Sequence, residues 1–125
     1  MILEFTKRRL QPDLTVLAME GSIHCGPECA RLEREVDGMI ALRETRVIFD
    51  MAGVTHADSA AVGTIVRCLA KLKGAGGGLR IATAQPMIAQ CLQMTKVDKI
   101  IEIFATVEQA AKGFSGPDAG AGQHA

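Results

Sequence analysis

The stretch from residue 47 to residue 72, VIFDMAGVTHADSAAVGTIVRCLAKL, decides the fold of this chain. It begins with Val47-Ile48-Phe49, an unbroken apolar run that predicts a strand buried on both faces. The glycine and polar residues over 50–58 predict a loop. Apolar residues then recur at steps of three and four, which is typical of a helix with one face on a core: Val62, Ile65, Val66, Leu69 and Leu72. The stretch therefore predicts one strand–loop–helix unit of an α/β fold.

The same order of strand and helix follows twice downstream. Residues 79–82 and 100–104 predict strands, and Pro86 begins the helix between them. Thr106 and Gln109 have the spacing of a capping box, which predicts the start of a short last helix. Because crossovers between such strands are right-handed, we expect the strands to be parallel.

Two extended segments, residues 2–7 and 14–20, precede the quoted stretch, and Pro12-Asp13 between them predicts a hairpin. Pro27 then begins an amphipathic helix that ends before Arg43. The expected fold is α/β with a mixed sheet that combines the N-terminal hairpin with parallel strands. The spacing of the apolar residues leaves open whether the helices cover one face of the sheet or both.

Composition excludes several classes of function. With 125 residues, 48% of them hydrophobic, the chain fits one domain over residues 1–114 and a disordered tail over 115–125. Fourteen Lys and Arg balance fourteen Asp and Glu, and the aromatic residues are four Phe, so we expect no nucleic acid partner. Without a secretory signal or an apolar run of about 20 residues, we expect a cytoplasmic protein with reduced cysteines and no direct membrane insertion.

Catalytic, metal and phosphate-loop motifs are weak. His24, Cys25 and Cys29 are too few for a structural zinc site, which needs four ligands, so we expect no metal. His56, Asp58 and Ser59 are too close in sequence to point at one another as a catalytic triad. The glycine run 74–78 follows a helix instead of preceding one, so it predicts a helix end and not a phosphate-binding loop. We therefore expect a protein that is not an enzyme, with no catalytic residues and no cofactor.

The Asp58-Ser59 pair is the most informative candidate site. Either side chain can cap the helix that follows, by accepting hydrogen bonds from amides of its first turn. Ser59 is in addition a candidate phosphorylation site, because its hydroxyl lies at a loop-to-helix junction where the helix dipole favours a phosphate. Small residues in the first turns leave a flat surface for a partner, although they equally suit tight packing of the helix on its sheet: Ala60, Ala61, Gly63 and Thr64.

These residues resemble the STAS family, typified by bacterial anti-sigma factor antagonists. Residues 47–54 are similar to the strand and Asp-Leu-Ser-x-Val of the family, and residues 58–63 to its Asp-Ser-Ser/Ala-Gly-Leu-Gly. Four further segments follow the family pattern, so that the resemblance covers nearly everything except the tail: residues 17–23, 72–81, 92–100 and 107–110. The resemblance implies a STAS-like mixed sheet with about four helices packed mainly on one face.

The resemblance also implies partner switching. In such systems the unmodified antagonist binds an anti-sigma factor that is itself a serine kinase, and so releases a sigma factor or a similar regulator. The kinase would phosphorylate Ser59, and a phosphatase acting on phosphorylated Ser59 would reset the complex. ATP and magnesium belong to the kinase. The implied partner-binding residues surround the serine: Asp58, Ala60, Ala61, Val62, Gly63, Thr64, Ile23 and His24.

Three residues depart from the family pattern, and a second function stays open. Ala61 and Lys96 each replace a usual glycine, and His24 stands where many members carry Asp. The methyl group of Ala61 is expected close to the docking surface, where it would alter the choice of partner. The alternative function is a non-switched STAS subunit with a structural role in a lipid transporter or a stress-sensing complex, where Ser59 would only cap its helix.

Overall fold

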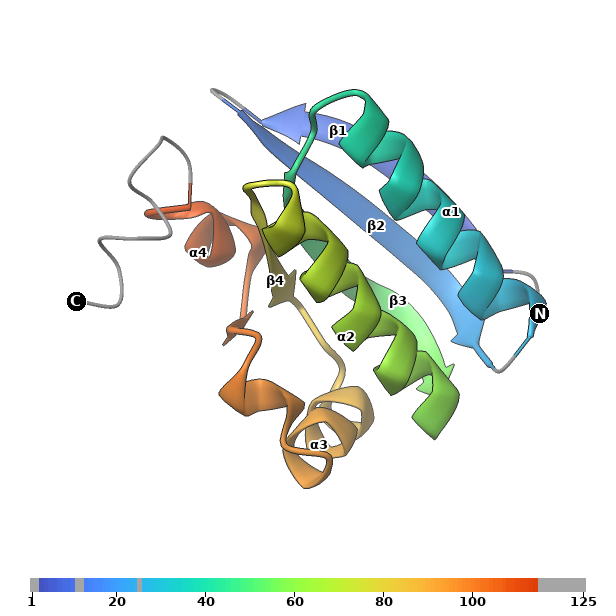
Figure 1. The fold of residues 1–125 in the computed structure, drawn as a ribbon. Helices are drawn as coiled ribbons and strands as arrows, with labels where there is room; N and C mark the ends of the chain where they lie inside the picture. The colour runs from blue at the N-terminus through green and yellow to red at the C-terminus, as the bar shows by residue number, and fades with distance from the viewer. Residues whose placement is uncertain (1–2, 11–12, 25, 115–125) are drawn as a thin grey trace.

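A mixed five-stranded sheet forms the centre of the computed structural model, which describes residues 3–10, 13–24 and 26–114 (Figure 1). Within these residues the strand order follows the sequence: β1 (Glu4–Leu10), β2 (Leu14–Ile23), β3 (Arg46–Ala57), β4 (Gly78–Ala82) and β5 (Ile103–Phe104). The first two strands form the predicted antiparallel hairpin, and all later neighbours are parallel. The predicted mixed α/β sheet is confirmed.

Helices cover the two faces of the sheet unequally. Three of them pack on one face: α1 (Pro27–Ala41), α2 (Ser59–Gly74) and α3 (Pro86–Met94) (Figure 1). The short helix α4 (Val107–Ala111) packs on the opposite face, where its buried residues join a separate apolar cluster with β2, β3 and β4. Thr106 accepts a hydrogen bond from the Gln109 N–H at 3.0 Å, which is half of the predicted capping box. The helices therefore pack mainly on one face, as the family resemblance implies.

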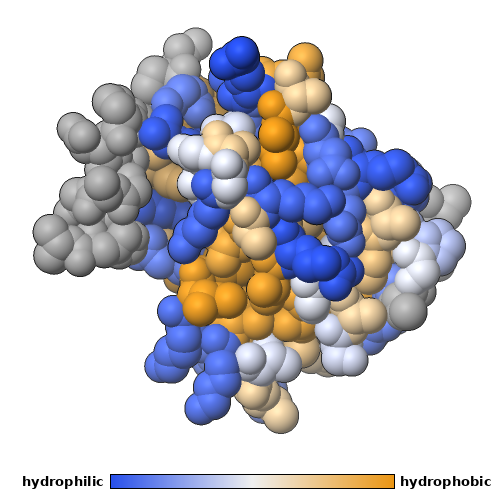
Figure 2. All heavy atoms as spheres, in the orientation of Figure 1, coloured by the Kyte–Doolittle hydropathy of each residue, from blue (hydrophilic) through white to orange (hydrophobic). Residues whose placement is uncertain are grey.

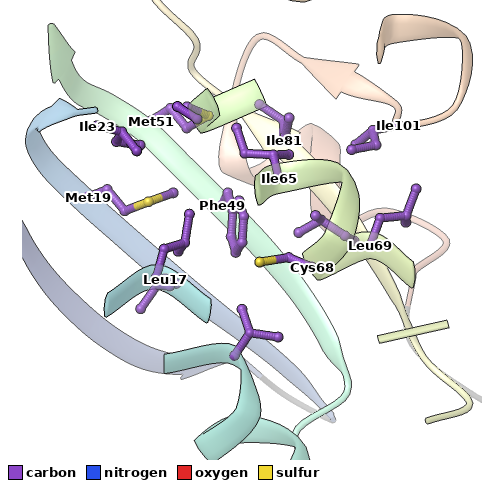
Figure 3. Packing of buried hydrophobic residues seen from close by; sticks show 14 of the residues in the cluster. Leu17, Met19, Ile23, Phe49, Met51, Ile65, Cys68, Leu69, Ile81 and Ile101 are labelled. Atoms are coloured by element: carbon purple, nitrogen blue, oxygen red, sulfur yellow. The ribbon is translucent and has the colours of Figure 1, made fainter. Parts of the chain in front are cut away.

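The larger core lies between the sheet and α2. Alternate residues of the central strand β3 point toward the helices, and Phe49 is completely buried among them (Figure 3). Ile65 and Leu69 of α2 lie over this strand, as the apolar spacing predicts, and Cys68, which the predicted stripe did not include, lies there too. The next residue along β3, Ile48, faces the other cluster, so the strand is buried on both faces.

Strand β3 is much longer than the sequence predicts. The prediction of a loop over residues 50–58 is wrong, because the chain stays extended to Ala57 and pairs with the second half of β2. Gly53 permits this pairing: a Cβ there would lie 2.6 Å from Glu20 Cγ and 2.9 Å from the carbonyl oxygen of Met19. The glycine that suggested a loop is therefore required for a close approach of two strands.

The last strand is shorter than predicted. Only Ile103–Phe104 pair with β4, and a 3-10 turn, η1 (Val97–Lys99), precedes them. Lys96 enters this turn with φ of 67°, a left-handed conformation that favours glycine, which explains the usual glycine of the family at this position. The change of direction at Lys96 leaves Ile100 outside the sheet with 53% of its surface exposed.

Ion pairs join α1 to α2 on the solvent side. Glu33 of α1 lies 2.9 Å from Arg67 Nε and 3.1 Å from Lys71 Nζ, and Lys71 also lies 3.0 Å from Asp37. Hydrogen bonds from Lys71 and Arg67 hold the pKa of Glu33 below its ordinary value. Hydrogen bonds to Asp37 and Glu33 raise the pKa of Lys71. Folding thus favours the charged forms of Glu33 and Lys71.

Replacement of Glu33 by Gln is expected to lower the free energy of unfolding by about 0.5–1 kcal/mol at pH 7. Folding lowers the pKa of Glu33. The stabilisation of the wild type relative to Glu33→Gln is therefore complete above the unfolded-state pKa, and it disappears as the pH falls through the lowered folded-state pKa. Urea titrations at several pH values measure this difference. Glu35→Gln, at an exposed position of the same helix, is the control and should show no such pH dependence. A Glu33→Gln effect that persists at pH 2 would contradict the ion-pair explanation.

Candidate functional site at the start of helix α2

Asp58 alone caps helix α2. Its backbone is extended, and its Oδ1 accepts a hydrogen bond from the Ala61 N–H at 2.9 Å. The Val62 N–H donates to the carbonyl oxygen of Asp58 at 3.2 Å, which closes the first turn. Ser59 is therefore the first residue of the helix and not its cap, and its side chain lies on the exposed surface.

The ends of β2 and β3 place a second segment beside this helix start. Ile23 and Ala57 are paired across the two strands, and the Asp58 N–H donates to the carbonyl oxygen of Ile23 at 3.3 Å. The next side chain, His24, places Nδ1 3.8 Å from Asp58 Oδ2. The side chains of His24 and Asp58 are 54% and 39% exposed, so they form one polar surface with Ser59.

The residues that the resemblance implied for partner binding divide into two groups. Asp58, Ala60, Gly63 and His24 are exposed or half-buried around Ser59. The side chains of the other four are buried under this surface: Ile23, Ala61, Val62 and Thr64. Because Ala61 is 0% exposed, its methyl group packs in the core. It adds no bulk to the surface around Ser59, contrary to the expectation from its departure from the family glycine.

Arg67 extends this surface, although it was not among the predicted site residues. Its Nη2 donates to Thr64 Oγ1 and its Nε to Glu33 Oε1, each at 2.9 Å. The Thr64 hydroxyl in turn donates to the carbonyl oxygen of Ala60 at 3.0 Å. A Cβ added at Gly63 would lie 3.7 Å from Arg67 Nη1, so the guanidinium lies beside the bare backbone of the first turns. Its spacing of four residues from Gly63 was the available signal.

An apolar surface lies between α2 and α3. Figure 2 shows it as a hydrophobic area in the middle of the view, between the positions of these two helices in Figure 1. Helix α3 contains no charged residue, and Met87 and Met94 are 64% and 74% exposed. Methionine side chains on a surface adapt to partners of different shape.

The remaining polar and sulfur groups form no second site in the described part of the chain. No three His, Cys, Asp or Glu side chains there lie close enough to hold a metal ion, and Cys25 is outside the described residues. Burial raises the pKa of the Cys68 thiol to about 12. His56 Nδ1 lies 3.1 Å from Thr55 Oγ1, at the end of β3. None of the helices in residues 3–10, 13–24 and 26–114 has the length and hydropathy needed to cross a membrane.

Comparison with solved structures gives the same architecture. A Thermotoga maritima protein assigned as an anti-sigma factor antagonist has a TM-score of 0.80 at 19% identity, over 88% of this chain and 93% of that one. Bacillus SpoIIAA in its phosphorylated form has a TM-score of 0.66 at 17% identity, over 86% of this chain and 96% of that one. The STAS domain of a SulP transporter from Vibrio cholerae has a TM-score of 0.63 at 18% identity, over 82% and 80% of the two chains.

At these identities the solved structures show the fold, and the family is shown by the sequence match. The family model described as the STAS domain matches residues 6–110 of this chain. The match includes β2, the start of α2 with Asp58 and Ser59, and the turn at Lys96. The chain belongs to the STAS domain family.

Proposed function

We propose that this STAS domain is a phosphorylation-switched protein-binding module of the cytoplasm with no catalytic activity of its own. The unmodified domain binds an anti-sigma factor that is also a serine kinase, and so releases a sigma factor or a similar regulator. Phosphorylation of Ser59 separates the two proteins, and a phosphatase restores the unmodified form. One observation carries this proposal: Ser59 is exposed at the first position of α2 while Asp58 supplies the cap.

The division of roles between Asp58 and Ser59 suits a switch. In the transfer, the γ-phosphoryl group of ATP moves to Ser59 Oγ, ADP leaves, and a kinase base takes the hydroxyl proton. Because the cap bond runs from the Ala61 N–H to Asp58, this change leaves the helix start intact. The dipole of α2 favours negative charge at its N-terminus, so the fold tolerates the phosphate.

A single phosphate supplies enough free energy to separate a complex. Loosening a complex 100-fold requires about 2.8 kcal/mol. Trapping an unpaired dianion in a desolvated contact costs several kcal/mol, roughly the penalty of an uncompensated buried charge. The flat surface around Ser59, made by Ala60 and Gly63, would bring a partner into such contact. SpoIIAA, an anti-sigma factor antagonist, has been solved in phosphorylated and unphosphorylated forms, which supports the same mode of regulation here.

We expect Ser59→Asp to weaken binding to the proposed anti-sigma kinase partner by at least about 100-fold, with the melting temperature little changed. Calorimetric titration measures the affinity. Ser59→Ala should bind as tightly as the wild type and should accept no phosphate from the kinase and ATP, as judged by mass spectrometry. Ala70→Asp adds the same charge at an exposed position about three turns further along α2, and should bind normally.

A fixed structural role is the second candidate function. The likeness to the STAS domain of a SulP transporter favours it, because that domain is part of a larger protein. In this role, within a transporter or a stress-sensing complex, Ser59 would be an ordinary surface residue. Equal binding by Ser59→Asp and Ser59→Ala would favour this role and would refute the switch.

A further inference from the structure

Arg67 lies on α2 two turns after Ser59, and its side chain points back toward the helix start. The 3.7 Å between Arg67 Nη1 and a Cβ built on Gly63 places the guanidinium level with Gly63. This direction is the usual one for long side chains in helices. Ser59 lies one turn, or about 6 Å of helix rise, before Gly63, and residue 63 places no side chain of its own between the two.

Two of the three guanidinium nitrogens of Arg67 donate hydrogen bonds to described residues. Nε donates to Glu33 Oε1 and Nη2 donates to Thr64 Oγ1, each at 2.9 Å. Among the described residues the structure gives Nη1 no acceptor, and Nη1 is the nitrogen nearest Gly63. Arg67 is 57% exposed, so its side chain has room to move. Its donor fork suits the oxygens of a phosphate.

Both groups that accept hydrogen bonds from Arg67, Glu33 and Thr64, have another partner. Glu33 Oε2 lies 3.1 Å from Lys71 Nζ, so Glu33 keeps a cation when Arg67 turns away. The Thr64 hydroxyl keeps its bond to the carbonyl oxygen of Ala60 at 3.0 Å. A move of Arg67 toward the helix start therefore leaves no buried polar group without a partner.

We propose that Arg67 is the intramolecular partner of the phosphate on Ser59, which it reaches across Gly63 by exchanging Glu33 for the phosphate. This inference rests on the proposed function, since it takes Ser59 as the modified residue. Arg67 is thus a positioning residue: it holds the phosphate against α2 and favours its dianionic form. Among the described residues beside Ser59, Asp58 would repel the phosphate, and His24 would attract it when protonated.

The test uses the full chain with phosphoserine installed at position 59 during translation, so that no kinase is needed. Phosphorus NMR over a pH titration measures the second pKa of the phosphate, which is about 6 for free phosphoserine. We expect this pKa to be higher by about 0.5 or more in Arg67→Gln than in the wild type, because the arginine stabilises the dianion. Asp58 and His24 are the same in both proteins, so their effects cancel.

Two matched substitutions separate the pairing from general charge. Lys73→Gln removes a cation from an exposed position of the same helix and should leave the phosphate pKa unchanged. Gly63→Leu keeps Arg67 but fills the space between it and Ser59, and should raise the pKa as Arg67→Gln does. Equal pKa values in the wild type and Arg67→Gln would overturn the inference and leave the switch at Ser59 standing. Failure of the kinase to modify Ser59, with the pKa difference present, would overturn the proposed function alone.

Discussion

Gly77→Ala is expected to lower the free energy of unfolding by more than about 3 kcal/mol, and the variant will be largely unfolded if the domain is marginally stable. A Cβ at this position would lie 1.8 Å from the carbonyl oxygen of Thr45 and 2.3 Å from its carbonyl carbon. These are backbone atoms, which no change of rotamer can move. The same carbonyl accepts the Gly78 N–H at 2.9 Å, so relief of the overlap would break the start of the β3–β4 pairing.

Gly74→Ala, in the same glycine run, is the matched control. It lies at the end of α2 with no atom within 4 Å of its added Cβ, and is expected to be neutral or stabilising by up to about 1 kcal/mol. Urea unfolding followed by circular dichroism compares the two midpoints. Equal midpoints for Gly77→Ala and Gly74→Ala would show that Thr45 and Gly77 are not in close contact.

Arg80→Ala is expected to lower the free energy of unfolding by about 3 kcal/mol, because it removes two charge-assisted hydrogen bonds and leaves a cavity. Arg80 is 6% exposed, and its Nη1 donates to the carbonyl oxygens of Ala110 at 2.9 Å and Lys112 at 2.8 Å. Its guanidinium carbon lies 5.3 Å from the ring centre of Phe104 and 4.5 Å from that of Phe114. Burial lowers the pKa of this guanidinium, which Glu102 partly offsets.

The damage from Arg80→Ala should concentrate on α4. Hydrogen exchange measured by mass spectrometry should show faster exchange over α4, while α2 keeps its protection at low denaturant. Glu102→Gln removes the exposed partner, 3.4 Å from Arg80 Nε, and should cost less than about 1 kcal/mol. Unchanged exchange over α4 in Arg80→Ala would show that the arginine does not hold this helix.

The elements that could be predicted are those in which local pattern and final contacts agree. The apolar run at Val47-Ile48-Phe49 lies in a strand buried on both faces, and Pro27 begins α1. Residues 50–57 could not be predicted, because their strand depends on pairing with β2 and on the missing side chain of Gly53. The burial of Arg80 also depends on distant groups: one carbonyl within α4, one just after it, and two phenylalanine rings.

Part of the candidate site could likewise be predicted from the sequence, and part could not. The Asp58-Ser59 pair at a helix start was visible as a motif, since a capping residue is a local signal. Only the hydrogen bond from the Ala61 N–H to Asp58 Oδ1 shows which of the two residues caps the helix. Arg67 was missed because its orientation is set by Glu33, a residue of another helix. The usual direction of a long helical side chain does not show which residue of another helix will bind it.

The hydrogen bond from the Asp58 N–H to the carbonyl oxygen of Ile23 joins the end of β2 to the start of α2, two segments that are remote in the chain. Since Ile23 is also paired with Ala57, the end of β2 and the start of α2 are joined at two adjacent positions. On the proposed docking surface, a change of partner is therefore expected to need substitutions in both segments together. A combinatorial library should therefore randomise His24 together with residues 58–60. Substitutions in one segment alone would have to fit a backbone that is bonded to the unchanged other segment.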